Sequence, residues 1–338
     1  MSKRETDSQT RHEDGGKSGR RLSGALLIVT SLVVLLIIAV IWQMLDRAEK
    51  QVGKIKSIKV AGAQGSGNEL KVAESNRLAE ELIERNQNER KLSFEFYDMT
   101  DQAMEYMPRL KKLEELSLAH TRITNSGLKY LTALPLTGLI LTNTDIDNEG
   151  LKHIAKLTRL GYLNLSDTDV NDEGLRQLEP LKDLSDLNLA ATKITDRGLP
   201  FLKVHQPIWK LVLLNTNVTD SGMAAITELK NLECLDVDST AVTIVGLRKL
   251  TACDKLRTLN LQNCLFNDRD AAELAKLLPA LSNLNISHTQ LTGKGLLSLA
   301  KLPKLSRLTI NRLPTISNAD LALFKAAKPD CLVIRDLP

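Results

Sequence analysis

Few residues in this 338-residue chain could do chemistry, and none of them forms a recognised catalytic spacing. The five histidines are scattered along the sequence, at His12, His120, His153, His205 and His288. The sequence contains no HExxH zinc site, no GxSxG nucleophile and no P-loop. It therefore predicts a protein that is not an enzyme, with no catalytic residue, no metal site and no cofactor.

The four cysteines, Cys234, Cys253, Cys264 and Cys331, form neither a CxxC site nor a paired framework. Cys264 stands where related segments of the chain have threonine, so we expect a small core residue there. Cys234 is expected to face outward from a strand, as a free thiol. The sequence leaves open whether any of the cysteines pair.

A glycine-rich loop holds Gly62, Gly65 and Gly67, between apolar residues and a helical pattern over residues 68–86. A strand, a glycine loop and a helix can bind phosphate. Here the spacing is GxxGxG and no GK[ST] follows, so neither nucleotide-binding motif is matched. An atypical N-terminal capping segment is the better interpretation.

The charge of the chain is nearly balanced. Lysine and arginine number 45 against 41 acidic residues, which gives a net charge of +4, and the two signs are interspersed. No basic face is concentrated enough to indicate nucleic acid as the main partner.

The elements that must position these residues come from one 24-residue unit, Leu157–Pro180. Leu163 and Leu165 alternate with polar residues, which is the period of a strand. Asn171 is suited to cap a helix, and Leu175 follows within that helix. A single unit cannot bury its leucines, so it needs a copy of itself on each side.

Copies of this unit recur at steps of 23 to 25 residues. The strand pairs are Leu116/Leu118, Leu139/Leu141, Leu163/Leu165, Leu187/Leu189, Leu211/Leu213, Leu235/Val237, Leu259/Leu261, Leu284/Ile286 and Leu308/Ile310. The residues that follow each pair by three are Thr121, Thr144, Thr168, Thr192, Thr216, Thr240, Cys264, Thr289 and Leu313. The helix-capping residues are Thr124, Asp147, Asn171, Thr195, Thr219, Thr243, Asn267, Thr292 and Ser317.

This pattern resembles the leucine-rich repeat, LxxLxLxx(N/C)xL, from about Leu110 to Phe324. The short helical half is similar to cysteine-containing and ribonuclease-inhibitor-like repeats, and especially to bacterial Thr-x-Ile-Thr-Asp-x-Gly-Leu arrays. Threonine stands where many families have Asn or Cys, and we expect its hydroxyl to bond the loop backbone. The resemblance implies an α/β solenoid, a leucine-rich-repeat arc with a parallel concave sheet and short convex helices.

The difference between strand spacing and helix spacing should curve the stack of repeats, with the strands on the inner side. Strands pair about 4.8 Å apart, whereas packed helices need about 8–10 Å. Nine strands would give a concave sheet about 40 Å wide, the kind of surface with which solenoids bind partners.

One apolar run, Ala25–Leu45, contains no charged residue. As a helix its 21 residues would extend about 31 Å, close to the thickness of a bilayer core. A buried helix and a cleaved signal peptide are the alternatives, but the run is longer than a usual signal core and no small-x-small cleavage site follows it. The sequence therefore predicts one transmembrane helix before the repeats.

Orientation is less sharply indicated, because basic residues flank both sides of the run, with Arg20 and Arg21 before it and Arg47 and Lys50 after it. We expect a signal anchor with the N-terminus in the cytoplasm and the repeat domain extracytoplasmic. The predicted segments are a disordered polar tail 1–24, a transmembrane helix 25–45, a juxtamembrane linker 46–51, N-terminal capping and divergent repeats 52–109, a repeat array 110–324 and a C-terminal cap 325–338.

The strand residues expected on the concave face, which flank the core leucines, are mostly small and polar. The exception is the fifth regular repeat, where the sequence IWKLVLL is expected to expose the apolar pair Val212 and Leu214. An apolar centre with a charged rim is typical of a protein-binding patch, and tryptophan is favoured at such sites. The alternative is that the tryptophan packs on the irregular loop Val204–Pro207 and that the apolar pair is neutral. The candidate ligand-binding residues are Trp209, Lys210, Val212, Leu214, Asp186, Asp236 and Asp238.

Together these patterns predict a membrane-anchored leucine-rich-repeat protein that binds a protein or cell-surface ligand through its concave face without catalysis. Two alternatives remain open at this stage. One is a cytoplasm-facing inhibitor or regulator of a partner enzyme, and the other is an accessory domain whose catalytic partner is a separate chain.

Overall fold

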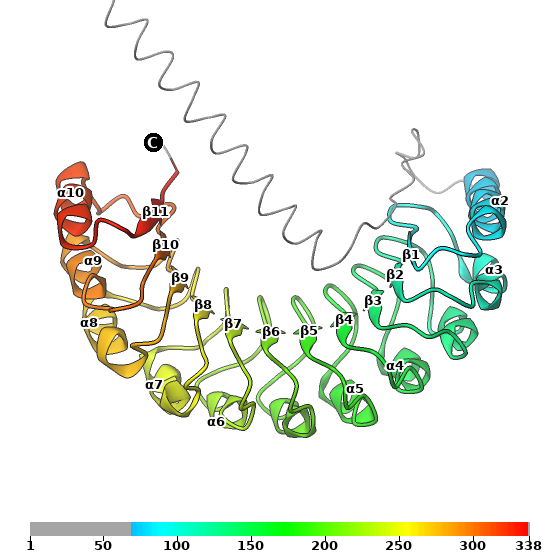
Figure 1. Cartoon of the computed structure of the whole chain (residues 1–338), viewed down its shortest axis with the longest axis horizontal. Coiled ribbons are helices and arrows are strands. Elements are labelled where there is room, and N and C mark those ends of the chain that lie inside the picture. The colour runs from blue at the N-terminus through cyan, green and yellow to red at the C-terminus, as the bar shows by residue number, and fades with distance from the viewer. Residues whose placement is uncertain (1–68, 337–338) are drawn as a thin grey trace, which may run out of the picture. The chain divides into compact units, whose positions relative to one another are not determined.

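The structure is a computed structural model that describes the backbone of residues 69–336 and the side chains of residues 72–336. The described residues form a curved solenoid with strands along the concave side and helices along the convex side (Figure 1). The predicted polar tail 1–24, membrane helix 25–45, linker 46–51 and glycine loop lie outside the described residues. Within the described part, no helix is long and apolar enough to cross a bilayer.

One sheet of eleven parallel strands runs through the repeats in chain order. The strands are β1 Lys91–Ser93, β2 Glu115–Ser117, β3 Gly138–Ile140, β4 Tyr162–Asn164, β5 Asp186–Asn188, β6 Lys210–Val212, β7 Cys234–Asp236, β8 Thr258–Asn260, β9 Asn283–Asn285, β10 Arg307–Thr309 and β11 Leu332–Ile334. The nine predicted strands are β2–β10, and β11 lies within the predicted C-terminal cap 325–338. β1 adds a strand in the divergent segment before the array.

Short helices return the chain from each strand to the next. The α-helices are α2 Glu69–Arg85, α3 Asp101–Met104, α4 Asn148–Ile154, α5 Asp172–Gln177, α6 Met223–Ile226, α7 Ile244–Leu247, α8 Asp268–Leu277, α9 Gly293–Leu299 and α10 Asn318–Ala327. The 3₁₀ helices are η1 Met107–Arg109, η2 Gly127–Leu131, η3 Leu199–Val204 and η4 Arg248–Ala252. Helix α2 lies where residues 68–86 have helical spacing.

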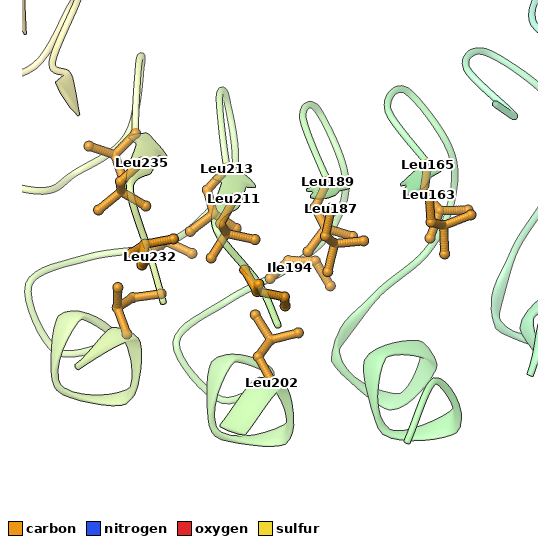
Figure 2. Close-up of a cluster of buried hydrophobic side chains, with 14 of the residues drawn as sticks. Leu163, Leu165, Leu187, Leu189, Ile194, Leu202, Leu211, Leu213, Leu232 and Leu235 are labelled. Atoms are coloured by element: carbon orange, nitrogen blue, oxygen red, sulfur yellow. The ribbon is translucent and has the colours of Figure 1, made fainter. Parts of the chain in front are cut away.

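The leucine pairs form one continuous core between the sheet and the helices (Figure 2). Leu187 and Leu189 are fully buried, as are Leu163 and Leu165 one repeat earlier. Strands β4–β10 all have a buried central residue between two half-buried neighbours. The predicted inward and outward register of the strands is therefore confirmed.

A ladder of threonine side chains stabilises the turn that follows the strands. Thr168 donates to the carbonyl of Leu165, and Thr192 donates to that of Leu189, both at 2.6 Å. Each threonine follows a residue with positive φ, such as Asp167. The hydroxyls thus bond the loop backbone, as expected. Cys264 is buried in the same ladder, with its Sγ 3.2 Å from the carbonyl oxygen of Val237 in the preceding repeat.

Carboxylates join successive repeats on the helical side. Asp172 accepts hydrogen bonds from the backbone N–H and the hydroxyl of Thr195, at 2.8 and 2.6 Å. The pairs Asp196 with Thr219, and Asp268 with Thr292, repeat the arrangement. Since these capping residues are held by the unit before them, the register of one repeat is transmitted to the next at these junctions.

Candidate functional site: the central concave surface

The sheet aligns the candidate residues in two neighbouring ladders of the concave face. In the first ladder, Asp186 of β5 pairs with Lys210 of β6, which pairs with Cys234 of β7. In the second ladder, Val212 lies between Asn188 and Asp236. Six of the seven predicted residues therefore belong to three adjacent strands and the loops that leave them, and Trp209 directly precedes β6.

The apolar centre of the site is formed by Val212 and Leu214. Both side chains are half-buried, and neither belongs to the core cluster of the described residues. Leu214 follows the strand between the backbone positions of Ala190 and Asp238, because Ala191 N–H donates to the Leu214 carbonyl and Asn215 N–H donates to that of Asp238. The predicted apolar break in a polar ladder is present, although the two side chains are less exposed than the sequence suggested.

The two carboxylate oxygens of Asp186 have different environments. Its Oδ2 lies 3.1 Å from the Lys210 ammonium, whereas its Oδ1 is buried without a hydrogen-bond partner. Burial raises the pKa of the Asp186 carboxyl, and the neighbouring Lys210 opposes that rise. A buried acceptor without a donor is costly, so a ligand that donates to Oδ1 would be favoured here.

Asp236 and Asp238 were both expected on an exposed rim, and for Asp238 this was wrong. Asp238 is 5% exposed, because its Oδ1 accepts from the Ser239 hydroxyl at 2.8 Å and from the Asn263 amide at 3.1 Å. Asp236 is half-buried, accepts the Asp238 N–H and the Asn260 amide, and has a pKa raised chiefly by burial. Asp238 therefore supports the loop, while Asp236 borders the surface.

Tyr162 and Asn188 are two residues of this surface that the sequence analysis did not select. Tyr162 pairs with Asp186 in the sheet, and burial followed by the charge of Asp186 raises the pKa of its phenol. The Oδ1 of Asn188 accepts the Ala190 N–H at 2.9 Å, which leaves its amide group directed away from that turn. The sequence could have indicated them, because they stand directly before Leu163 and directly after Leu187. Residues that flank the central leucine of a strand in this way face the concave side.

Trp209 is half-buried at the entrance of β6. Its backbone N–H donates to the carbonyl of Ser185 at 2.9 Å, and its own carbonyl accepts from the backbone N–H groups of both Glu233 and Cys234. The backbone of Trp209 is therefore built into the ladder that holds β5, β6 and β7 together. Its role as a ligand anchor remains a prediction.

Cys234 is half-buried, whereas Cys253, Cys264 and Cys331 are buried, and all four thiols are free. Burial raises the pKa of the Cys234 thiol to about 11. Because the thiolate is the reactive form, Cys234 is a weak nucleophile at neutral pH, even though it borders the site.

His205 is fully buried in the loop before β6, with Nδ1 2.8 Å from the carbonyl oxygen of Leu181 and Nε2 without a partner. Burial lowers the pKa of the His205 imidazole. Among the described residues, no group of three or more His, Cys, Asp or Glu side chains could hold a metal ion.

Comparison with known proteins identifies the repeat. A sequence profile described as "Leucine Rich repeat" matches residues 109–131, 158–178 and 281–300. A search of curated proteins finds no match. The chain thus contains leucine-rich repeats, a class of domain that generally binds proteins.

The fold is also similar to a solved structure, an internalin from Listeria monocytogenes str. 4b F2365. The two chains are 19% identical, with a TM-score of 0.54, over 73% of this chain and 74% of the internalin. At this identity the similarity concerns the fold alone: a leucine-rich-repeat solenoid with a parallel sheet.

Proposed function

We propose that this protein is a membrane-anchored binding protein whose central concave surface, formed by Asp186, Asn188, Lys210, Val212, Leu214 and Asp236, holds a protein or cell-surface ligand without catalysis. The observation that carries the proposal is the apolar pair Val212 and Leu214 beside the unpartnered Oδ1 of Asp186. An apolar centre with a few directed polar groups is the arrangement of a binding hot spot.

The chemistry of the surface suggests what the ligand presents. A side chain with an apolar stem could cover Val212, while an amide or cationic group donates to Asp186 Oδ1. Arginine and lysine combine such a stem with donors. The carboxylates of Asp186 and Asp236 outnumber the single ammonium of Lys210 in this cluster, which also favours a cationic group.

A photoreactive amino acid at position 214 of the full-length chain, in native membranes, tests this surface. We expect crosslinks to a partner from position 214 and not from position 142. Thr142 is the matched control because it occupies the same place in its repeat as Leu214 does in its own, and it is also half-buried. Equal capture from both positions, or capture from neither, would contradict the central site.

The proposed anchor is the uncharged run Ala25–Leu45, with the N-terminus in the cytoplasm and the repeat domain extracytoplasmic. Its support is its length and composition, which suit a bilayer core. A periplasm- or lumen-active reporter fused after Pro338 should be active, and externally added protease should reach the repeats. Protection of the repeats would favour the cytoplasm-facing regulator instead.

A further inference from the structure

The last strand of the sheet differs from every internal strand. In β4–β10 the central residue is buried, whereas in β11 the central Val333 is only half-buried and Leu332 and Ile334 are exposed. At the other end of the sheet, the central residue of β1, Leu92, is 3% exposed. Of the two ends of the described sheet, β11 is therefore the one with an open apolar edge.

The backbone of β11 has hydrogen-bonding groups directed away from the array. Leu332 N–H donates to Ser306 at 2.8 Å, and the Ile334 carbonyl accepts from Ile310 at 2.9 Å. These two residues therefore turn their backbone groups towards β10, and Val333 between them turns its N–H and carbonyl to the opposite side. An exposed edge with free donors and acceptors is a template for pairing with another strand.

We propose that β11 pairs antiparallel with β11 of a second copy of this chain, which joins two solenoids into one continuous sheet around a twofold axis at Val333. Val333 then exchanges both backbone hydrogen bonds with its counterpart. Leu332 lies opposite the second copy's Ile334, and the reverse pair follows by symmetry. Two apolar cross-strand pairs and a dry edge stabilise the contact.

A second copy fits this edge better than a head-to-tail neighbour. A head-to-tail stack would pair β11 with β1, whose central Leu92 is buried and would add no exposed apolar surface to the contact. The twofold arrangement uses the same surface on both copies and closes after two chains. It also leaves the concave surface of both solenoids open, so it is independent of the proposed ligand site.

The register makes a prediction about charge. With the axis at Val333, Asp336 lies opposite the second copy's Asp330, and both side chains are exposed. Like charges placed directly opposite are unfavourable, so they weaken the pairing without preventing it. Asp336→Lys replaces both repulsive pairs by attractive pairs and should strengthen the association.

Disulfide trapping with two variants of the full-length chain in detergent tests the register. Opposed antiparallel residues outside the hydrogen-bonded pair lie about 4.5 Å apart at Cα, within the range for a disulfide. Mixing Leu332→Cys chains with Ile334→Cys chains should give a mixed disulfide at least about tenfold faster than either variant alone, since identical positions meet only diagonally. The unsubstituted chain, with Cys331 buried, supplies the baseline.

Val333→Pro on the same cysteine backgrounds separates edge pairing from general adhesion. Proline removes the N–H that faces away from β10, so the array itself should keep its circular dichroism spectrum while the crosslink is lost. Asp336→Lys should accelerate the same crosslink. No crosslink in any mixture, equal crosslinking in all mixtures, or crosslinking that survives Val333→Pro would overturn the proposal.

Discussion

Asp220 occupies the space that a side chain on Gly246 would need. The Oδ1 of Asp220 accepts the Gly246 N–H at 2.9 Å, and a Cβ on Gly246 would lie 2.5 Å from that oxygen. Where Ile244 replaces the aspartate, the next helix has Asp270 in place of the glycine, and Asp270 Oδ2 accepts the capping N–H of Asn267 at 2.9 Å. At these two caps a carboxylate accepts the capping N–H, from the preceding repeat at Thr243 and from the helix itself at Asn267.

This relationship predicts that Gly246→Ala destabilises the array, although alanine favours a helix over glycine by about 1 kcal/mol. The added Cβ would meet Asp220 Oδ1 and would also lie 3.0 Å from the Asp220 Cα, so the backbone must move. Overpacking of this kind costs about 1–3 kcal/mol. Chemical denaturation measures the change.

The control for this effect copies the exchange found one repeat later, where Ile244 stands in place of the aspartate and Asp270 in place of the glycine. The double variant Asp220→Ile with Gly246→Asp should be more stable than the sum of its two single variants, because the carboxylate then comes from within the helix as it does at Asp270. Additive effects would show that the two positions are not coupled.

Membrane anchoring gives a second prediction. Deleting Ala25–Leu45 should release a soluble and folded array, because Leu187, Leu211 and their counterparts are buried by one another. Circular dichroism should show both helix and strand. Aggregation, or loss of the spectrum, would mean that the deleted run is part of the fold.

A core substitution in the middle of the array gives a third prediction. Leu187→Ala should lower the free energy of unfolding by about 2–5 kcal/mol, since Leu187 is fully buried. The neighbouring Asn188→Ala, on the concave face, should change it by less than about 0.5 kcal/mol. The Asn188 side chain does accept the Ala190 N–H, so a change above that value would assign a structural role to this turn.

Periodicity in the sequence was enough to predict the elements that hold the site. Leu187 recurs at the strand position of each repeat and Thr192 at the turn position. Because the repeats stack on one another, only the face that carries the leucines can form the core. The sequence did not predict the burial of Asp238, because that burial comes from Ser239 and Asn263, polar side chains of its own loop and of the next repeat. Asp186 Oδ1 could not be predicted to lack a donor, since this depends on where the single Lys210 ammonium points.

A fourth prediction concerns pH. His205 occupies the core position that Leu181 and Leu229 hold in neighbouring repeats, and burial lowers the pKa of its imidazole below the usual value of about 6.5. Above that pH both folded and unfolded chains are neutral at this residue. As the pH falls through the usual pKa, the unfolded chain takes up a proton that the folded chain resists, so the free energy of unfolding falls.

Denaturation series at pH 7.5 and pH 5.5 with His205→Leu check this dependence. The substitution should reduce the loss of stability on acidification, although it also removes the hydrogen bond to Leu181 and so carries a cost at both values of pH. An unchanged difference between the two pH values would assign the acid sensitivity to other groups.

The fifth prediction concerns ligand affinity at the central concave surface. Leu214→Ser should weaken partner binding at least about tenfold, equivalent to about 1.4 kcal/mol, because a binding patch loses its apolar centre. Leu214 is the cleaner probe, since Ala190 and Asp238 hold the same place in adjacent repeats and show that the fold accepts small or polar side chains there. Trp209→Ala should weaken binding to a similar degree if Trp209 is an anchor, but its stability must be measured in parallel because its backbone joins three strands. The partner captured from position 214 serves as the ligand in a titration, with Thr142→Ala as the control that should leave the affinity unchanged. Unchanged affinity in a folded Leu214→Ser variant would remove the central concave surface as the binding site and direct attention to the convex helices.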